Sequence, residues 1–127
     1  MLIIDATAKT PKIVFNKELG ELEISGRSLP EDAQEYYSPM VTELTEWLNN
    51  PTENFKVVFA LEYLNTSSSG VVRKLMETIT NAHIEGKTKV TIVWCYEEDD
   101  YEMEEMGRHY EHTIDNLPIE FKQIEEQ

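Results

Sequence analysis

The sequence predicts a single α/β domain over residues 1–127, with a mixed sheet of four to six strands, an N-terminal hairpin and helices packed against the sheet. Three patterns indicate this class. Apolar residues alternate with polar ones over 13–24, two strongly apolar segments follow at 57–64 and 90–96, and apolar residues recur at helical spacing between and beside them. A chain of 127 residues suits one domain with an ordinary core.

The first predicted unit is a β-hairpin. Ile13 and Phe15 precede the polar turn at 16–20, and Leu22 and Ile24 follow it. The alternation predicts two strands with one buried and one solvated face. Residues 1–7 are expected to add a short strand.

A helix is predicted next, after the pattern breaks at 26–30. One face carries Ala33, Tyr36, Met40, Leu44 and Trp47, and it is widened by Tyr37, Val41 and Leu48. Ser38 and Pro39 interrupt it, and because serine caps helices and proline suits a first turn, we expect a kink or a restart there. The helix should end before the segment 49–51.

Residues 57–64 and 90–96 read as interior strands, because they are apolar on both faces apart from Glu62. Between them, apolar residues at helical spacing from Val72 to Ala82 predict a helix that ends near Gly86. Strand, helix and strand should form a parallel unit with a right-handed crossover.

The C-terminal part opens with an acidic run at 97–105, where carboxylates favour the start of a helix. A helical stripe follows, made of Met103, Met106, Tyr110 and Ile114. We expect this helix to end by Leu117 and Pro118, and residues 119–124 to form a short edge strand. As an alternative, the acidic run could bind Mg²⁺ or Ca²⁺, but it lacks the glycine turn and ligand spacing of an EF-hand loop.

The charge and composition of the chain limit which partners it is expected to bind and in which compartment it is expected to lie. The formal net charge of −14 argues against nucleic acid and anionic membranes, and favours a basic or neutral partner surface. The single cysteine leaves no internal disulfide, as a reducing cytoplasm allows. The N-terminus does not resemble a signal peptide and no apolar run is long enough to span a membrane, so we expect a cytoplasmic protein.

No catalytic residue, cofactor or metal site is predicted. Cys95 lies in the middle of an apolar strand, where a thiol is usually inert, and His109 and His112 lack a third ligand. The sequence contains no G-x-S-x-G elbow, Walker A loop or G-x-G-x-x-G loop. A small enzyme or metal protein that uses Cys95 or the pair His109 and His112 stays open as an alternative.

The segment 64–70 is the first candidate site, because a buried strand ends there and a helix begins. Asn65 is followed by four hydroxyl residues, from Thr66 to Ser69. One reading is helix capping, for which Asn65, Thr66, Ser67 and Ser68 are all competent. The sharper hypothesis is that Thr66 is a reversible phosphorylation site, since a helix N-terminus accommodates a phosphate well.

The segment 26–32 is the second candidate surface. Its structural reading is a turn in which Ser28 caps the next helix and Glu31 completes a capping box. Arg27 is one of three arginines in a very acidic chain. It could contact a partner carboxylate or a phosphate on Thr66, or pair with a neighbouring acid.

Four segments together resemble the SiaC family of bacterial regulatory phosphoproteins, and the similarity runs over nearly the whole chain. They are Lys9-Thr10-Pro11, Ser25 to Ala33 (SGRSLPEDA), Tyr63 to Ser68 (YLNTSS) and Trp94 to Asp100 (WCYEEDD). The N-T-S-S and G-R-S-x-P-E pieces are the specific ones. Asp32 and Glu102 differ from the residues common in the family. The identity of the partner therefore stays open.

The resemblance implies a fold similar to the anti-sigma-factor antagonists (STAS-like) and a phosphorylatable threonine at Thr66. It implies a cognate protein kinase, a PP2C-type phosphatase, and an unmodified form that binds and activates a diguanylate cyclase in cyclic-di-GMP signalling and biofilm control. An anti-sigma-factor antagonist in a transcription pathway is the alternative. The residues expected to bind the partner or the kinase are Arg27, Ser28, Pro30, Glu31, Asn65, Ser67 and Ser68.

Overall fold

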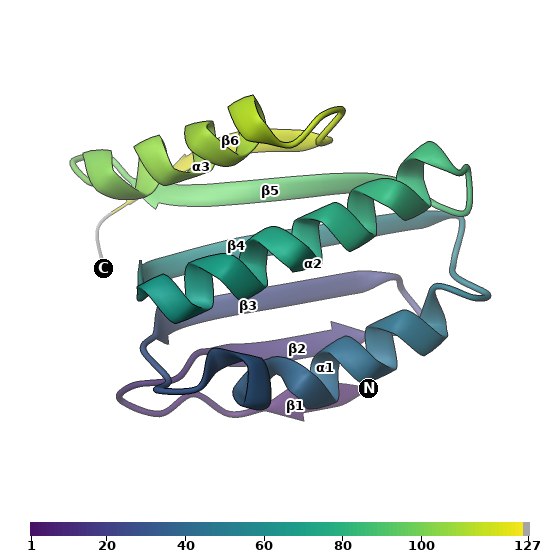
Figure 1. Ribbon diagram of the computed structural model, residues 1–127, viewed down its shortest axis with the longest axis horizontal. Coiled ribbons are helices and arrows are strands. Elements are labelled where there is room, and N and C mark those ends of the chain that lie inside the picture. Colours follow the sequence, from purple (N-terminus) through teal and green to yellow (C-terminus); the bar gives the residue numbers. More distant parts are fainter. Residues whose placement is uncertain (126–127) are drawn as a thin grey trace.

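The structure, a computed structural model, describes residues 1–125 as one six-stranded sheet with three helices (Figure 1). The strands are β1 (Leu2–Ile4), β2 (Lys12–Asn16), β3 (Glu21–Ser28), β4 (Asn54–Leu64), β5 (Lys89–Glu97) and β6 (Ile119–Ile124). The helices are α1 (Ala33–Trp47), α2 (Thr66–Ile84) and α3 (Tyr101–Thr113). The predicted mixed α/β architecture, the hairpin and the short first strand are confirmed; the STAS-like relationship stays a prediction.

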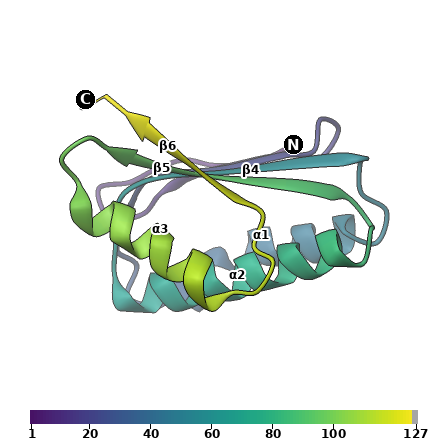
Figure 2. The ribbon, with the colours of Figure 1, turned by 90° about the horizontal axis from the view of Figure 1, so that it is seen from above.

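The strands lie in the sheet in the same order as in the chain, from β1 to β6. The first two pairings are antiparallel and the last three are parallel, so the strand–helix–strand unit of β4, α2 and β5 is parallel as predicted. Each parallel connection carries one helix, and all three helices cover the same face of the sheet (Figure 2). This follows because crossovers of one hand that always step to the next strand place their helices on one side.

The core lies between this face and the helices. Alternate residues of the strands point into it, among them Ile13, Phe15, Leu22, Ile24, Phe59 and Trp94. From the helices, Tyr37, Met40, Leu44, Met76 and Ile79 complete it. The Trp94 indole donates a hydrogen bond of 2.8 Å to the Met103 carbonyl, which ties β5 to α3. The periods of two and 3.6 in the sequence therefore predicted the core-facing residues of both kinds of element.

Two expectations need correction. The helix does not restart at Ser38: α1 is continuous from Ala33 to Trp47 and contains Pro39. Residues 57–64 and 90–96 are central in the sheet, but they are not covered on both faces. Val58, Ala60 and Val93 point to the face without helices and stay half-buried, because the consecutive strand order leaves every helix of residues 1–125 on the opposite face.

Helix α3 packs so closely on the sheet at Gly107 that a larger side chain has no room there. A Cβ atom there would lie 2.5 Å from Cδ1 of Trp94 and 2.7 Å from Cε1 of Phe121. We expect Gly107→Ala to lower the free energy of unfolding by about 1–3 kcal/mol, because two aromatic rings would have to shift. Gly70→Ala in α2 is the control, since a Cβ there meets nothing within 4 Å. It should stabilise by about 0.5–1 kcal/mol, and a similar gain at Gly107 in denaturant melts would contradict the packing.

Candidate functional site

The two candidate segments meet at one edge of the sheet. Strands β3 and β4 are parallel, with Ser28 paired to Leu64 at their carboxyl ends. Helices α1 and α2 begin just beyond these ends, at Ala33 and Thr66. The turns 28–33 and 64–68 are therefore neighbours, and two helix N-termini open at the same place.

Asn65 fastens one turn to the other. Its backbone N–H donates to the Ser28 carbonyl at 2.9 Å, and its side-chain amide donates to the Pro30 carbonyl at 2.9 Å. Its Oδ1 accepts from the Ser68 N–H at 2.9 Å, so Asn65 is the N-cap of α2. Of the four predicted cap candidates, Asn65 makes the cap, and it binds the neighbouring turn with its remaining groups.

A buried cluster of three hydroxyl groups lies beneath the turns. Ser28 Oγ is 2.7 Å from Tyr37 Oη and 2.8 Å from Ser68 Oγ. Ser28 and Ser68 have relative exposures of 0% and Tyr37 has 1%. Burial raises the pKa of Tyr37 to about 12, although the hydrogen bond to Ser28 acts in the opposite direction. All three groups therefore stay neutral at physiological pH, and the cluster links β3, α1 and α2.

Thr66 is displayed above this framework. It is exposed, occupies the first helical position after the cap, and its hydroxyl forms none of the hydrogen bonds found within residues 1–125. Ser67 beside it is also exposed, and its Oγ accepts a hydrogen bond of 3.3 Å from the Ala33 N–H of α1. The Thr66 hydroxyl is thus accessible and carries no structural duty within the described chain.

Two helix N-termini contribute positive potential at this edge. The N-termini of α1 and α2 both point to it, and each carries a partial positive charge. Arg73 of α2 is committed elsewhere: it donates to Thr113 Oγ1 at 2.6 Å and lies over the Tyr110 ring at 5.3 Å. The helix ends, and not Arg73, are the groups that would stabilise a phosphate on Thr66.

The second candidate segment differs from its predicted local structure. Ser28 does not cap α1, and the predicted capping box with Glu31 is wrong. Asp32 is the N-cap and accepts from the Glu35 N–H at 3.1 Å, while Ser28 belongs to the end of β3. Arg27 and Glu31 are exposed, and Arg27 takes part in none of the ion pairs of residues 1–125.

Among the residues expected to bind a partner, the structure thus separates two groups. Arg27, Glu31 and Ser67 are exposed beside the turns and can be reached from solvent. Ser28, Ser68 and Pro30 are buried, and Asn65 is half-buried. In this conformation the buried residues position the site instead of contacting a partner.

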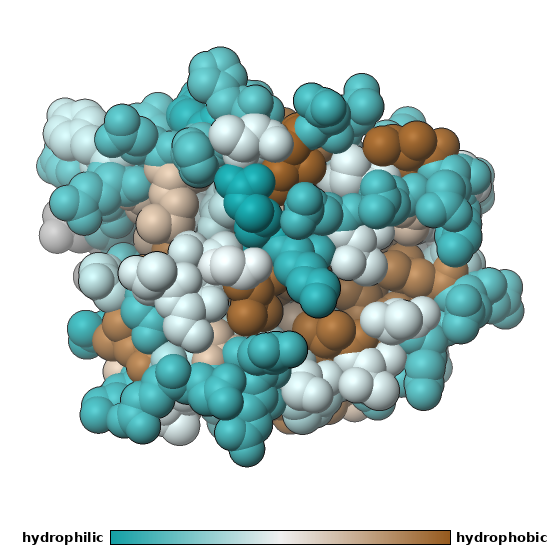
Figure 3. Space-filling view, viewed as in Figure 1, coloured by the Kyte–Doolittle hydropathy of each residue, from teal (hydrophilic) through white to brown (hydrophobic). Residues whose placement is uncertain are grey.

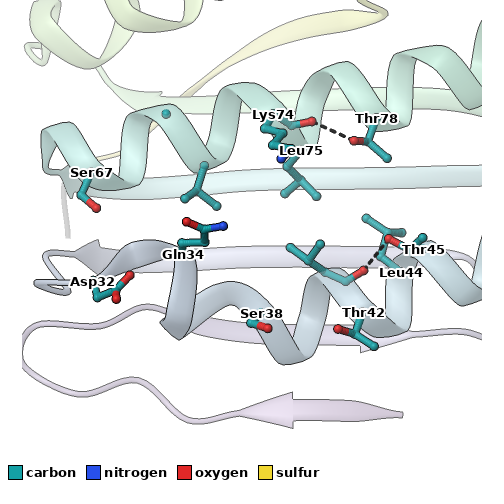
Figure 4. Close-up of a pocket in the computed structure, with 13 residues that line it drawn as sticks. Asp32, Gln34, Ser38, Thr42, Leu44, Thr45, Ser67, Lys74, Leu75 and Thr78 are labelled. Carbon is teal, nitrogen blue, oxygen red and sulfur yellow. Dashed lines mark hydrogen bonds between the residues drawn. The ribbon is translucent and has the colours of Figure 1, made fainter.

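A groove leads away from this site between α1 and α2. Ser67 and Asp32 line one end of it, and Gln34, Leu75 and Ser67 point into the space between the helices (Figure 4). The helix face of the molecule shows apolar surface gathered in the same region (Figure 3). We call this feature the α1–α2 groove.

The other candidate residues, on β5 and α3, are not part of this site. Cys95 is buried, and burial raises the pKa of its thiol, so the reactive thiolate is disfavoured. His109 and His112 are exposed on α3, and the described chain holds no group of three His, Cys, Asp or Glu side chains arranged for a metal. In the acidic run, Asp100 caps α3 by accepting from the Met103 N–H at 3.1 Å.

No helix within residues 1–125 is long and apolar enough to cross a membrane.

Sequence reasoning missed the role of Tyr37, which it placed only on the apolar face of α1. Tyrosine on a core-facing helix position is compatible with simple packing, and nothing local shows that its hydroxyl meets Ser28 and Ser68. The one available hint is that a fully buried tyrosine hydroxyl needs a hydrogen-bond partner.

Comparison with known proteins agrees with the segments singled out in the sequence. The family described as SiaC family regulatory phosphoprotein matches residues 4–124. An uncharacterized protein of Pseudomonas aeruginosa strain UCBPP-PA14 is 26% identical over 109 residues, which are 86% of this chain and 86% of that protein.

Solved structures share the fold. SiaC of Pseudomonas aeruginosa superposes with a TM-score of 0.86 at 24% identity, covering 97% of this chain and 98% of that one. The apo form of SiaC gives 0.85 at 25% identity, with 95% and 97% covered. A complex of the diguanylate cyclase SiaD with its activator SiaC, from the same organism, contains a chain that matches with a TM-score of 0.89 at 23% identity, with 98% and 100% covered.

The different roles of Asn65 and Thr66 can be tested by measuring the free energy of unfolding of variants. We expect Asn65→Ala to lower the free energy of unfolding by about 1–2 kcal/mol, since it removes the cap and the bond to Pro30. Thr66→Ala should change it by less than about 0.5 kcal/mol, because the hydroxyl has no partner within residues 1–125. Urea melts of both variants measure the difference. A larger loss for Thr66→Ala would mean that Thr66 has a structural role.

Proposed function

The chain belongs to the SiaC family of regulatory phosphoproteins, and from this we propose that it is a phosphorylation-controlled binding protein whose switch is Thr66. One observation carries the proposal. Thr66 is exposed and its hydroxyl takes part in none of the hydrogen bonds of the described chain, while Asn65 and Ser68 on either side of the segment hold the turn. A kinase can therefore modify Thr66 without dismantling the turn.

The effector is a diguanylate cyclase, which the unmodified protein binds and activates. The support is the likeness to SiaC, which is described as the activator of the diguanylate cyclase SiaD in their complex. A cognate kinase adds the phosphate and a PP2C-type phosphatase removes it, so the output is the level of cyclic-di-GMP. The surface around Thr66, with Arg27, Glu31 and Ser67, is the contact region for these partners.

The size of the effects favours control at an interface over control by refolding. A phosphate adds about −1.5 to −2 charges at neutral pH. At a helix N-terminus it is tolerated, with a gain of about 0.3–1 kcal/mol, so the fold is maintained. Beneath a docked partner the same charge loses water, and an uncompensated charge there costs about 3 kcal/mol or more. Such a loss corresponds to about a hundredfold weaker binding.

The first test identifies the modified residue. Incubation of the purified protein with the cognate kinase and ATP should add one phosphate, detected by intact-mass spectrometry. Thr66→Ala should abolish the mass increase, while Ser67→Ala, at a neighbour that is also exposed, should retain it. A phosphate that still appears on the Thr66→Ala protein would rule out Thr66 as the switch.

The second test measures the effector. We expect Thr66→Glu to weaken binding to the diguanylate cyclase at least tenfold and to reduce cyclic-di-GMP synthesis in the mixture, with a melting temperature within a few degrees of the parent. Asn81→Glu adds the same charge at an exposed position of α2 that lies outside the α1–α2 groove, and should leave binding unchanged. Calorimetry and a cyclase assay provide the readings. Equal losses for both variants would point to overall charge instead of a local switch.

A further inference from the structure

Strand β6 forms one edge of the sheet and leaves a row of backbone groups unpaired. Within residues 1–125 its neighbour in the strand order is β5, and it runs along the outer edge of the sheet in Figure 1. The strand at the other edge, β1, has 3 residues, whereas β6 has 6. A very short edge strand offers little to a pairing partner, while a longer one is a template for another strand. The edge at β6 is therefore the place where the sheet can be extended.

The hydrogen bonding to β5 determines which residues of β6 point outward. The Ile92 N–H of β5 donates to the Pro118 carbonyl at 2.8 Å. Because successive residues of a strand direct their backbone groups to opposite sides, the even-numbered residues of β6 face β5 and the odd-numbered ones face solvent. Phe121 and Gln123 thus present both their N–H and their C=O groups outward. Ile119 presents its carbonyl, since its N–H is bonded within the preceding turn.

Two opposite charges lie on this edge without a partner in the described chain. Glu120 and Lys122 are exposed, and their neighbours on β5 are the uncharged side chains of Val93 and Cys95. Neither charge belongs to the ion pairs of residues 1–125. A lysine on an edge strand normally prevents pairing with another strand. An acid two residues before it changes this, because in one register of an antiparallel pair both charges are neutralised.

That register is one in which the strand pairs with itself. When a two-fold axis passes through Phe121, this residue exchanges both of its outward hydrogen bonds with Phe121 of the second copy. The Gln123 N–H then meets the outward carbonyl of Ile119. Glu120 lies directly opposite Lys122 of the second copy, at a position without backbone hydrogen bonds, where facing side chains come closest. Moving the axis by one residue places Glu120 opposite Glu120, or Lys122 opposite Lys122.

We propose that the protein forms a two-fold dimer in which β6 pairs antiparallel with β6 of a second copy, centred on Phe121 and held in register by the Glu120–Lys122 ion pairs. On the helix face the two Phe121 rings come together, each lying beneath its own α3, where the Arg108 guanidinium is 3.7 Å from the ring centroid. The contact is small, so a weak dimer is expected, with a dissociation constant in the micromolar range.

The dimer is independent of the proposed function. Thr66 follows β4, and β5 separates β4 from β6 in the sheet. The switch segment therefore stays exposed in both copies. Loss of the dimer would leave the phosphorylation switch untouched, and loss of the switch would leave the dimer.

The test reverses each charge and then both, with the dissociation constant measured by sedimentation velocity over a range of concentrations. Lys122→Glu and Glu120→Lys should each weaken the dimer about tenfold, because each places like charges opposite one another twice. Each reversal changes the net charge by two, from −14 to −16 and from −14 to −12 respectively. An effect of overall charge would therefore move the two variants in opposite directions. The double variant Glu120→Lys with Lys122→Glu should dimerise like the parent.

A backbone variant tests the strand pairing itself. Gln123→Pro removes an outward N–H that bonds nothing within residues 1–125, and an edge strand accepts proline in this orientation, so the melting temperature should stay within a few degrees of the parent. The dimer should weaken severalfold, while Gln123→Ala, which retains the N–H, should dimerise like the parent.

Three results would overturn the proposal. They are a parent protein that stays monomeric up to about 1 mM, single reversals that dimerise like the parent, and a double reversal that does not restore the dimer. Equal dimerisation of Gln123→Pro and Gln123→Ala would also overturn it, since the pairing would then not use the edge of β6.

Discussion

Three buried hydroxyl groups, on Ser28, Tyr37 and Ser68, hold together the end of β3, the body of α1 and the start of α2. Each would be costly to bury alone, since a polar group without a partner inside a protein loses about 1–3 kcal/mol. Together they satisfy one another in a site that water does not reach. The positions of both turns depend on this contact, and with them the direction in which Thr66 faces solvent.

Neighbouring residues of the site have different roles. Asn65 and Ser68 carry the hydrogen bonds that join the turns, while the Thr66 hydroxyl takes part in none of the hydrogen bonds within residues 1–125. The proposed phosphorylation at Thr66 would change the charge of this surface and leave its scaffold fixed, because the accepting hydroxyl and the structural atoms belong to different side chains. The α1–α2 groove extends the same surface along the two helices.

Local pattern predicted the hairpin, all three helices and the three later strands, since apolar periodicity is a property of short segments. It failed where the deciding partner is distant in sequence. Ser28 was expected to cap the following helix, but its hydroxyl bonds Ser68, 40 residues away. Pro39 was expected to interrupt α1, but packing on the sheet keeps the helix whole. The half-covered sheet was missed because strand order is not encoded in any single strand. Thr66 itself was singled out by its place after an apolar strand, and family membership then rested on several segments together.

The consecutive strand order has a consequence for how the protein is made. Every strand from β2 to β6 pairs with the one that precedes it in the chain, so no strand must wait for a later segment to find its place in the sheet. Topologies dominated by such neighbouring connections fold faster than those that require distant pairings. During synthesis the sheet can grow from β1 outward as the chain leaves the ribosome, with each new helix covering the strand pair just completed.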